Sequence, residues 1–156
     1  AADEVQRQEV PLAQHAFEAV APGFAANIKA GDILVAGRNF GINSSREQAA
    51  RVILLMGVAA VVARSFGRQF YRNAINNGLP LIECNITSLG DGEEITLDLA
   101  TGVVILNRGK AMHAKPLSLE ILSILASGGL IPFLDRHPDW KLTGSDKGDR
   151  NENSKD

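Results

Sequence analysis

The feature that most constrains the fold of this chain is an uninterrupted apolar run at residues 58–63, Val-Ala-Ala-Val-Val-Ala. Such a run is typical of a strand that is covered on both faces, because successive side chains on a strand point to opposite faces. Apolar segments at 33–36 and 79–82 flank the run, and helical patterns at about 45–56 and 67–76 lie between the three segments. This βαβαβ order predicts an α/β fold with parallel strands and right-handed crossovers.

Length and composition narrow the possible functions. A chain of 156 residues fits one domain, and a net charge of −2 gives no reason to expect nucleic acid as a partner. No apolar run reaches the ~18 residues that a membrane span needs, so we expect no membrane contact and a cytoplasmic location. We expect one domain over residues 1–143 and a disordered tail over 144–156, because the tail contains no apolar residue.

The single cysteine, Cys84, excludes an internal disulfide and any three-cysteine cluster built by this chain alone. Its place at a strand end is typical of a buried, small apolar residue.

The segments around the core are predicted from periodicity. Pro11 suits a first helical turn, and the apolar spacing after it predicts a helix that ends at Pro22-Gly23. Ile95, Leu97 and Leu99 alternate with polar residues, which predicts an antiparallel hairpin with residues 103–106. Beyond the hairpin we expect a loop with His113 and Lys115, a helix at about 118–126, and a short strand or docking segment at 131–134.

Residues 37–48, Gly-Arg-Asn-Phe-Gly-Ile-Asn-Ser-Ser-Arg-Glu-Gln, connect the first strand to the first helix of the core. Such a joint directs backbone N–H groups and the positive end of a helix dipole at whatever lies above it. Here it also carries two hydroxyls, Ser44 and Ser45, and the guanidinium of Arg46, a combination that suits a carboxylate-bearing substrate. The loop lacks the G-x-G-x-x-G, P-loop and G-x-S-x-G motifs, so dinucleotide, P-loop and hydrolase sites have little support.

Each of these polar residues also has a purely structural interpretation. Ser44 and Glu47 form the S-x-x-E capping-box pattern, and a serine N-cap contributes about 1 kcal/mol to helix stability without any chemistry. Asn39 and Asn43 are typical of turns and of positive φ, and Asn73 is typical of a helix end. Arginines recur every four residues and could line one helix face, either solvated or facing an acidic partner or anionic substrate: Arg64, Arg68 and Arg72.

An ordered set of motifs between Gly31 and Glu83 resembles the small subunit of 3-isopropylmalate dehydratase, which corresponds to the swivelling fourth domain of aconitase. The resemblance implies a β/β/α swivelling domain of the aconitase C-terminal type, with the βαβαβ core followed by a β-hairpin and a C-terminal helix. The motifs that carry it are Gly-Asp-Ile-Leu-Val-Ala-Gly at 31–37, Asn-Phe-Gly at 39–41, Ser-Ser-Arg-Glu at 44–47, Ala-Arg-Ser-Phe at 63–66, Phe-Tyr-Arg-Asn-Ala-Ile-Asn at 70–76 and Gly-Leu-Pro at 78–80.

The resemblance also implies an active site. Ser44 would act as an alkoxide base that takes a proton from carbon, and Ser45 and Arg46 would hold a substrate carboxylate. Residues in supporting roles would be Asn39, Asn43, Gln48, Arg64 and Arg72.

The family uses a [4Fe–4S] cluster in which one iron is a Lewis acid for the departing hydroxyl. Three cysteines must hold that cluster and this chain has one, so we expect the cluster on a large iron–sulfur subunit and no metal ligand here.

The implied function is a hydro-lyase subunit that helps to interconvert 3- and 2-isopropylmalate in leucine biosynthesis. Homoaconitate, citraconate or maleate, and methylated malates are alternative substrates.

Three departures from the family pattern bear on these expectations. The family has Cys-Gly where this chain has Ile42-Asn43, and we expect Asn43 to keep the positive φ of that glycine. Gln48 replaces a common histidine and cannot titrate. The family begins with a strand and a Thr-Asp-x-Ile-like loop that helps to fix substrate choice. Either the protein is shortened, or this sequence omits its beginning.

A non-catalytic interaction module is therefore a second hypothesis. The intact Ser44-Ser45-Arg46 triplet argues against it, since a binding module needs none of these residues together.

Overall fold

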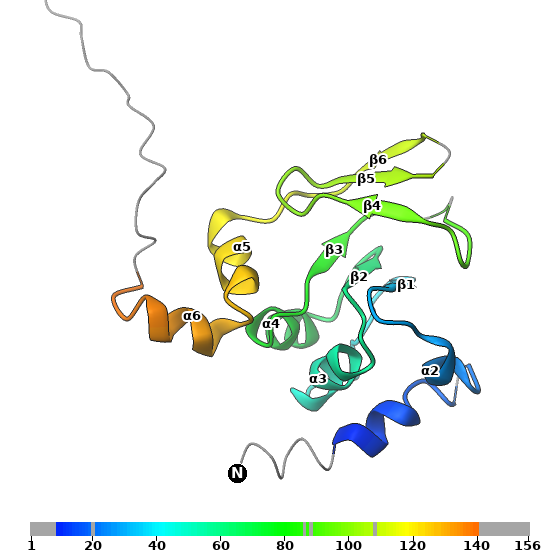
Figure 1. Cartoon of the computed structure of the whole chain (residues 1–156), viewed down its shortest axis with the longest axis horizontal. Coiled ribbons are helices and arrows are strands. Elements are labelled where there is room, and N and C mark those ends of the chain that lie inside the picture. Colours follow the sequence, from blue (N-terminus) through cyan, green and yellow to red (C-terminus); the bar gives the residue numbers. More distant parts are fainter. Residues whose placement is uncertain (1–8, 20, 86, 88, 108, 141–156) are drawn as a thin grey trace, which may run out of the picture.

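The computed structural model describes residues 9–140 apart from 20, 86, 88 and 108, so the expected disordered tail lies outside the described residues. None of the described helices combines the length and apolar character needed to cross a membrane. The elements, shown in Figure 1, are a helix at 9–14, α2 (Phe24–Asn27), β1 (Ile33–Ala36), α3 (Gln48–Leu55), β2 (Ala60–Ala63), α4 (Arg68–Asn76), β3 (Leu81–Glu83), β4 (Ile95–Leu97), β5 (Val103–Leu106), β6 (Ala111–His113), α5 (Leu119–Ala126) and α6 (Leu130–Arg136).

The first sheet has the order β1-β2-β3, and both strand pairs are parallel. Ile33 is opposite Ala60 and Val61 is opposite Leu81, so all three strands run in the same direction. The predicted βαβαβ core is confirmed.

Alternation along β2 explains its continuous apolar run. Val61 packs into a core shared with α3 and α4, whereas its neighbour Val62 packs into a second core shared with β5. All four residues of β2 are buried. The molecule therefore has three layers: the β4–β6 sheet, the parallel sheet, and the helices α3 and α4 (Figure 1).

The second sheet contains the predicted hairpin and one strand more. β4 pairs with β5 as expected, and β5 also pairs with β6, where Val103 is opposite His113. The expectation that His113 lies in a loop was wrong. This strand has only three residues, and only Met112 among them is partly buried, so its alternating pattern is too weak to predict a strand. The strand forms because the edge of β5 offers it a partner.

The C-terminal helices form a third apolar cluster with α4, built on Ile75, Ile124 and Phe133. Residues 131–134, expected to be a strand or docking segment, instead belong to α6. A Cβ added at Gly129 would lie 2.6 Å from the carbonyl oxygen of Asn76, so only glycine allows this close crossing of α4 and the α5–α6 junction. The crossing places α6 where it can bury Phe133.

The N-terminal helix starts and ends earlier than predicted. Among the described residues it covers 9–14, Leu12 is exposed, and Phe17 has a left-handed φ of 66°. That conformation ends the helix and is accompanied by ring contacts of Phe17 with Phe24 and Phe40, with centroids 5.5 and 6.3 Å apart. Aromatic packing across the chain thus overrides the local helical pattern.

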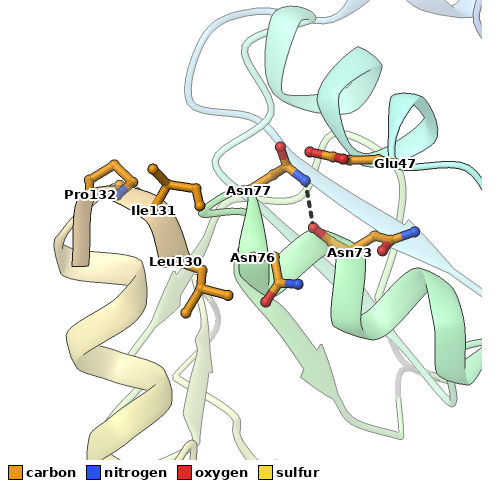
Figure 2. Close-up of a pocket in the computed structure, with 8 residues that line it drawn as sticks. Glu47, Asn73, Asn76, Asn77, Leu130, Ile131 and Pro132 are labelled. Atoms are coloured by element: carbon orange, nitrogen blue, oxygen red, sulfur yellow. Dashed lines mark hydrogen bonds between the residues drawn. The ribbon is translucent and has the colours of Figure 1, made fainter. Parts of the chain in front are cut away.

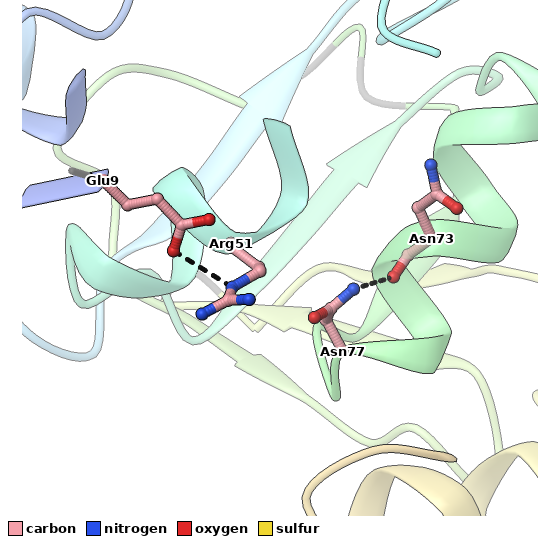
Figure 3. A network of polar contacts seen from close by, with 4 residues as sticks. All are labelled: Glu9, Arg51, Asn73 and Asn77. Carbon is pink, nitrogen blue, oxygen red and sulfur yellow. Dashed lines mark hydrogen bonds and ion pairs between the residues drawn. The ribbon is translucent and has the colours of Figure 1, made fainter. Parts of the chain in front are cut away.

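One partly buried ion pair attaches the N-terminal helix to α3. Oε2 of Glu9, a residue that is only 1% exposed, lies 3.0 Å from Nε of Arg51 (Figure 3). Arg51 is the only partner of this carboxylate among the described residues.

Candidate functional site

The site is built at the carboxyl edge of the parallel sheet, where the loops after β1 and β2 meet. The N–H of Phe40 donates to the carbonyl of Ser65 at 3.0 Å, and the N–H of Gly67 donates to the carbonyl of Phe40 at 2.8 Å. Phe40 and Phe66 thereby form a one-residue parallel bridge. Strand pairing between β1 and β2 thus continues into the loop at 37–47 and fixes its first half.

Asn39 has the structural role that its residue type suggested. It takes a left-handed φ of 57°, its N–H donates to Oγ of Ser65 at 2.8 Å, and the Ser65 hydroxyl donates back to Oδ1 at 3.3 Å. Asn43, in contrast, is not among the residues with positive φ, so that expectation was wrong. The left-handed positions of this loop are Asn39 and Gly41, and an asparagine at 43 meets no such constraint.

Helix α4 supports the middle of the loop by close backbone packing. A Cβ at Gly41 would lie 2.3 Å from Cγ of Phe70, and a Cβ at Gly67 would lie 2.6 Å from Cα of Ile42. The ring of Phe40 packs edge-to-face on Phe70 with centroids 5.3 Å apart. The two glycines therefore allow the loop to lie directly on the N-terminal half of α4.

The three predicted site residues follow this supported segment. Ser44 is half-buried and its N–H donates to the carbonyl of Gly41 at 2.9 Å, while Ser45 and Arg46 are exposed. The capping-box prediction was wrong, because α3 begins at Gln48, and its N-cap, Glu47, makes no side-chain cap. Within the described part of the chain, the Ser44 hydroxyl has no hydrogen-bond partner, so helix capping does not occupy it.

The backbone at the start of α3 offers free donors. Among the described residues, the N–H groups of 45–48 have no backbone or side-chain acceptor, and the first N–H group that is satisfied belongs to Ala49, which donates to the carbonyl of Arg46 at 3.2 Å. Such a row of N–H groups at a helix N-terminus favours an anion.

The charged side chains of this part of the chain are mostly positive, which also favours an anion. The segment 37–73 holds one acidic residue, Glu47, and in the described residues the only ion pair of any arginine is that of Arg51. Arg64 lies after β2, off the helix, so the predicted three-arginine helix face was wrong for that residue. The exposed arginines available to an anionic ligand are Arg38, Arg46, Arg64, Arg68 and Arg72.

A cleft of about 390 Å³ lies beside the loop (Figure 2). Two residues of the cleft wall connect it to the loop. Glu47 is part of the loop, and Nδ2 of Asn73 donates to the carbonyl of Ser45 at 3.3 Å. The sequence indicated only a helix end at Asn73, and a contact across 28 residues leaves no local signal. The remaining lining residues are Asn76, Asn77, Gly128, Leu130, Ile131 and Pro132.

The donor groups of the described residues do not fit an iron–sulfur cluster, whose usual ligands are several cysteine thiolates. Cys84 packs with Val62 and Ile82 at 6% exposure, which confirms its apolar role, and burial raises the pKa of its thiol. Nowhere in the described ranges do three His, Cys, Asp or Glu side chains gather closely enough to hold a metal ion. Burial, and then the Glu83 carboxylate, also raises the pKa of Tyr71 on α4, so its hydroxyl is neutral at pH 7.

Comparison with known proteins agrees with this architecture. Residues 4–85 match the aconitase C-terminal domain family. The chain is 42% identical over 138 residues to 3-isopropylmalate dehydratase small subunit 2 of Archaeoglobus fulgidus, covering 87% of this chain and 84% of the relative. It is 44% identical over 136 residues to the methanogen homoaconitase small subunit of Methanothermobacter thermautotrophicus, covering 86% and 79%.

A solved structure supports the same assignment. The crystal structure of a 3-isopropylmalate dehydratase from Methanocaldococcus jannaschii superimposes with a TM-score of 0.77 at 40% identity, covering 83% of this chain and 78% of that one. The family resemblance and the α/β swivelling-domain fold expected from the sequence are both confirmed. The chain belongs to the aconitase C-terminal domain family.

Proposed function

We propose that the chain is the small subunit of a heteromeric hydro-lyase that dehydrates and rehydrates a hydroxy di- or tricarboxylic acid in the cytoplasm. The leading reaction is the interconversion of 3- and 2-isopropylmalate, because the Archaeoglobus relative and the Methanocaldococcus structure carry that name. The observation that carries the proposal is the loop at Ser44, Ser45 and Arg46. Within the described residues it combines a hydroxyl without a partner, unpaired backbone N–H groups and an exposed guanidinium.

In this proposal Ser44 is the base. Its Oγ, as an alkoxide, takes the proton from the substrate carbon, and the C–O bond on the neighbouring carbon breaks with departure of hydroxide. The proton held on Ser44 and this hydroxide together make up the water that is eliminated. Serine is a very weak acid, so the site must stabilise the alkoxide, and the α3 N-terminus and the guanidinium of Arg46 both favour the negative charge. The lack of a helix-capping bond leaves the Ser44 hydroxyl available for this role.

Ser45 and Arg46 bind a substrate carboxylate. The planar guanidinium offers two parallel donors to the two carboxylate oxygens. In the supporting roles, Asn39 shapes the loop through Ser65, and the exposed cations of Arg64 and Arg72 favour an anion near the same edge of the sheet. Asn43 and Gln48 are exposed and offer uncharged hydrogen-bonding groups.

A large subunit with a [4Fe–4S] cluster would complete the site. The relatives are named small subunits, and the single buried thiol of Cys84 does not fit cluster binding by this chain. The cluster would supply a Lewis acid for the departing hydroxyl.

Homoaconitate is a second candidate substrate, favoured by the Methanothermobacter relative. Its 44% identity is close to the 42% of the Archaeoglobus small subunit, so overall identity does not separate the two substrates. Citraconate, maleate and methylated malates complete the panel to be assayed.

The first test is turnover. The chain alone should be inactive, and mixing it with its large subunit under anaerobic, iron-replete conditions should give dehydration of isopropylmalate. Ser44→Ala should lower kcat by at least ~10²-fold, the usual scale for a positioned base. Ser127→Ala, a matched hydroxyl deletion after α5, should leave kcat unchanged. Near-wild-type kcat in Ser44→Ala would remove this residue from the mechanism, and a complex without turnover on any panel member would favour the interaction-module hypothesis.

The second test concerns carboxylate binding. Arg46→Lys should mainly raise KM, because lysine keeps the charge and loses the two-pronged grip. Arg136→Lys, a matched change in an exposed arginine of α6, should have no effect. An unchanged KM in Arg46→Lys would count against carboxylate binding at this position.

A further inference from the structure

We infer that Asn73 is a positioning residue for the Ser44–Arg46 loop: its side-chain amide fixes the peptide group that joins Ser45 to Arg46. The inference rests on the proposed function for its consequence in catalysis. The structural part stands on contacts that can be tested in the chain alone.

The contact itself has an unambiguous polarity. Nδ2 of Asn73 lies 3.3 Å from the carbonyl oxygen of Ser45. A carbonyl oxygen only accepts hydrogen bonds, so the asparagine must present its NH₂ group, because Oδ1 in that place would bring two acceptors together. An isosteric carboxylate at position 73 would therefore repel this oxygen.

The other anchors of the loop are local. Ser44 is bonded through its N–H to Gly41, and the carbonyl of Arg46 accepts from Ala49, so both bonds lie within the loop and the start of α3 and tie it to no other element. Among the hydrogen bonds of the described residues, that of Asn73 is the only one that ties residues 44–46 to a distant element. It is the bond that ties the predicted site residues to α4.

The place of Asn73 on α4 is consistent with this role. Gly67, Phe70 and Asn73 are spaced by three residues, so they share one face of the helix. Gly67 contacts the backbone of Ile42, Phe70 contacts Gly41, and Asn73 contacts Ser45. One helix face thus supports the loop from its middle to the predicted site.

The backbone of Asn73 is held in turn by the end of its own helix. Nδ2 of Asn77 donates to the carbonyl of Asn73 at 2.8 Å (Figures 2 and 3). Asn77 therefore stabilises the last turn of α4, while the side chain of Asn73 extends to the loop.

Loss of the amide should reduce the fraction of molecules with a correctly placed loop. A neutral hydrogen bond shifts such an equilibrium by roughly 3- to 10-fold, and a replacement that leaves two acceptors face to face should lie at the upper end. Both the hydroxyl of Ser44 and the guanidinium of Arg46 would be displaced, so kcat should fall and KM should rise together.

The first experiment uses the chain alone. Hydrogen exchange of the Ser44 and Ala49 amides should accelerate by roughly 3- to 10-fold in Asn73→Ala and Asn73→Asp. Asn76→Ala and Asn76→Asp are matched controls, because Asn76 lies on the same helix, lines the same cleft, and has no side-chain bond to the loop among the described residues (Figure 2). Equal exchange in Asn73→Asp and Asn76→Asp would overturn the inference.

The second experiment uses the complex with the large subunit. Asn73→Asp should lower kcat/KM by roughly 3- to 10-fold through both parameters, and Asn76→Asp should match wild type. If exchange changes while kcat/KM of Asn73→Asp equals that of Asn76→Asp, positioning for catalysis is refuted and the proposed function stands. If the wild-type complex turns over no member of the substrate panel, the proposed function fails, and the exchange result alone decides whether Asn73 fixes the loop.

Discussion

Gly41→Ala is the sharpest test of how the site loop is supported. Gly41 has a φ of 75°, a left-handed conformation that alanine adopts only with strain. The added methyl carbon would also lie 2.3, 2.7 and 2.7 Å from Cγ, Cβ and Cδ1 of Phe70, whose side chain is 1% exposed. The substitution therefore combines a backbone penalty with overlap against a ring that has little room to move.

The expected loss of stability is the sum of these two terms. Placing an L-residue in the left-handed region costs about 1–2 kcal/mol. Overpacking a filled core costs about 1–3 kcal/mol in addition. We expect a loss of about 2–5 kcal/mol, a large share of the roughly 5–15 kcal/mol that a domain of this size possesses.

Two control glycines separate the backbone cost from the cost of overpacking. Gly92 has nearly the same φ, 72°, and a Cβ there would meet nothing within 4 Å, so Gly92→Ala should lose only the backbone term. Gly37 lies in the same loop, without a left-handed φ and with open space around its Cα, so Gly37→Ala should be close to neutral. Urea unfolding of the three variants, compared through the midpoint at constant m-value, gives each free-energy change.

The relative stabilities of Gly41→Ala and Gly92→Ala test the contact with Phe70. Contact between Gly41 and Phe70 requires Gly41→Ala to be less stable than Gly92→Ala by at least about 1 kcal/mol. If these two variants unfold at the same denaturant concentration, the loop does not lie on the Phe70 ring as described, and the support inferred from α4 loses its main structural basis.

Two further predictions concern charged residues. Arg51→Ala should reduce the free energy of unfolding by about 1–3 kcal/mol, because it leaves the Glu9 carboxylate buried without its partner. The arginine is 35% exposed, which keeps this cost below that of a fully buried pair, and a urea midpoint equal to that of Arg136→Ala would contradict it. Hydrogen bonds from the side chain and backbone of Thr101, and then from the Ala100 N–H, hold the pKa of Asp98 below its usual value. The ionised carboxylate therefore stabilises the folded state above the ordinary carboxyl pKa, and this stabilisation is lost as pH falls through the folded-state pKa. Asp98→Asn should therefore be less stable than wild type at pH 7 with a gap that closes below about pH 4, and a gap independent of pH would refute that assignment.

Much of the fold was predictable from the sequence because its signals are local. The apolar runs at 33–36, 58–63 and 79–82 predicted three parallel strands, and alternation near Ile95 predicted the hairpin. The errors occurred where packing across the chain overrode local pattern. Phe17 leaves a helical pattern to contact Phe40, and residues 131–134 become helical because the Gly128-Gly129 break lets α6 pack on α4.

The sequence by itself determined the composition of the candidate site: two hydroxyls and a guanidinium in one short loop, with too few cysteines for a cluster. Only the tertiary structure decided that Ser44 is not the helix cap, that Asn43 needs no positive φ, and that Asn73 holds Ser45. The physical reason is separation along the chain. Hydroxyl and guanidinium chemistry can be read from single residues, whereas the orientation of the loop depends on bonds to α4, which begins more than twenty residues after Ser44. Bonds over such a separation leave no periodic signal in the sequence.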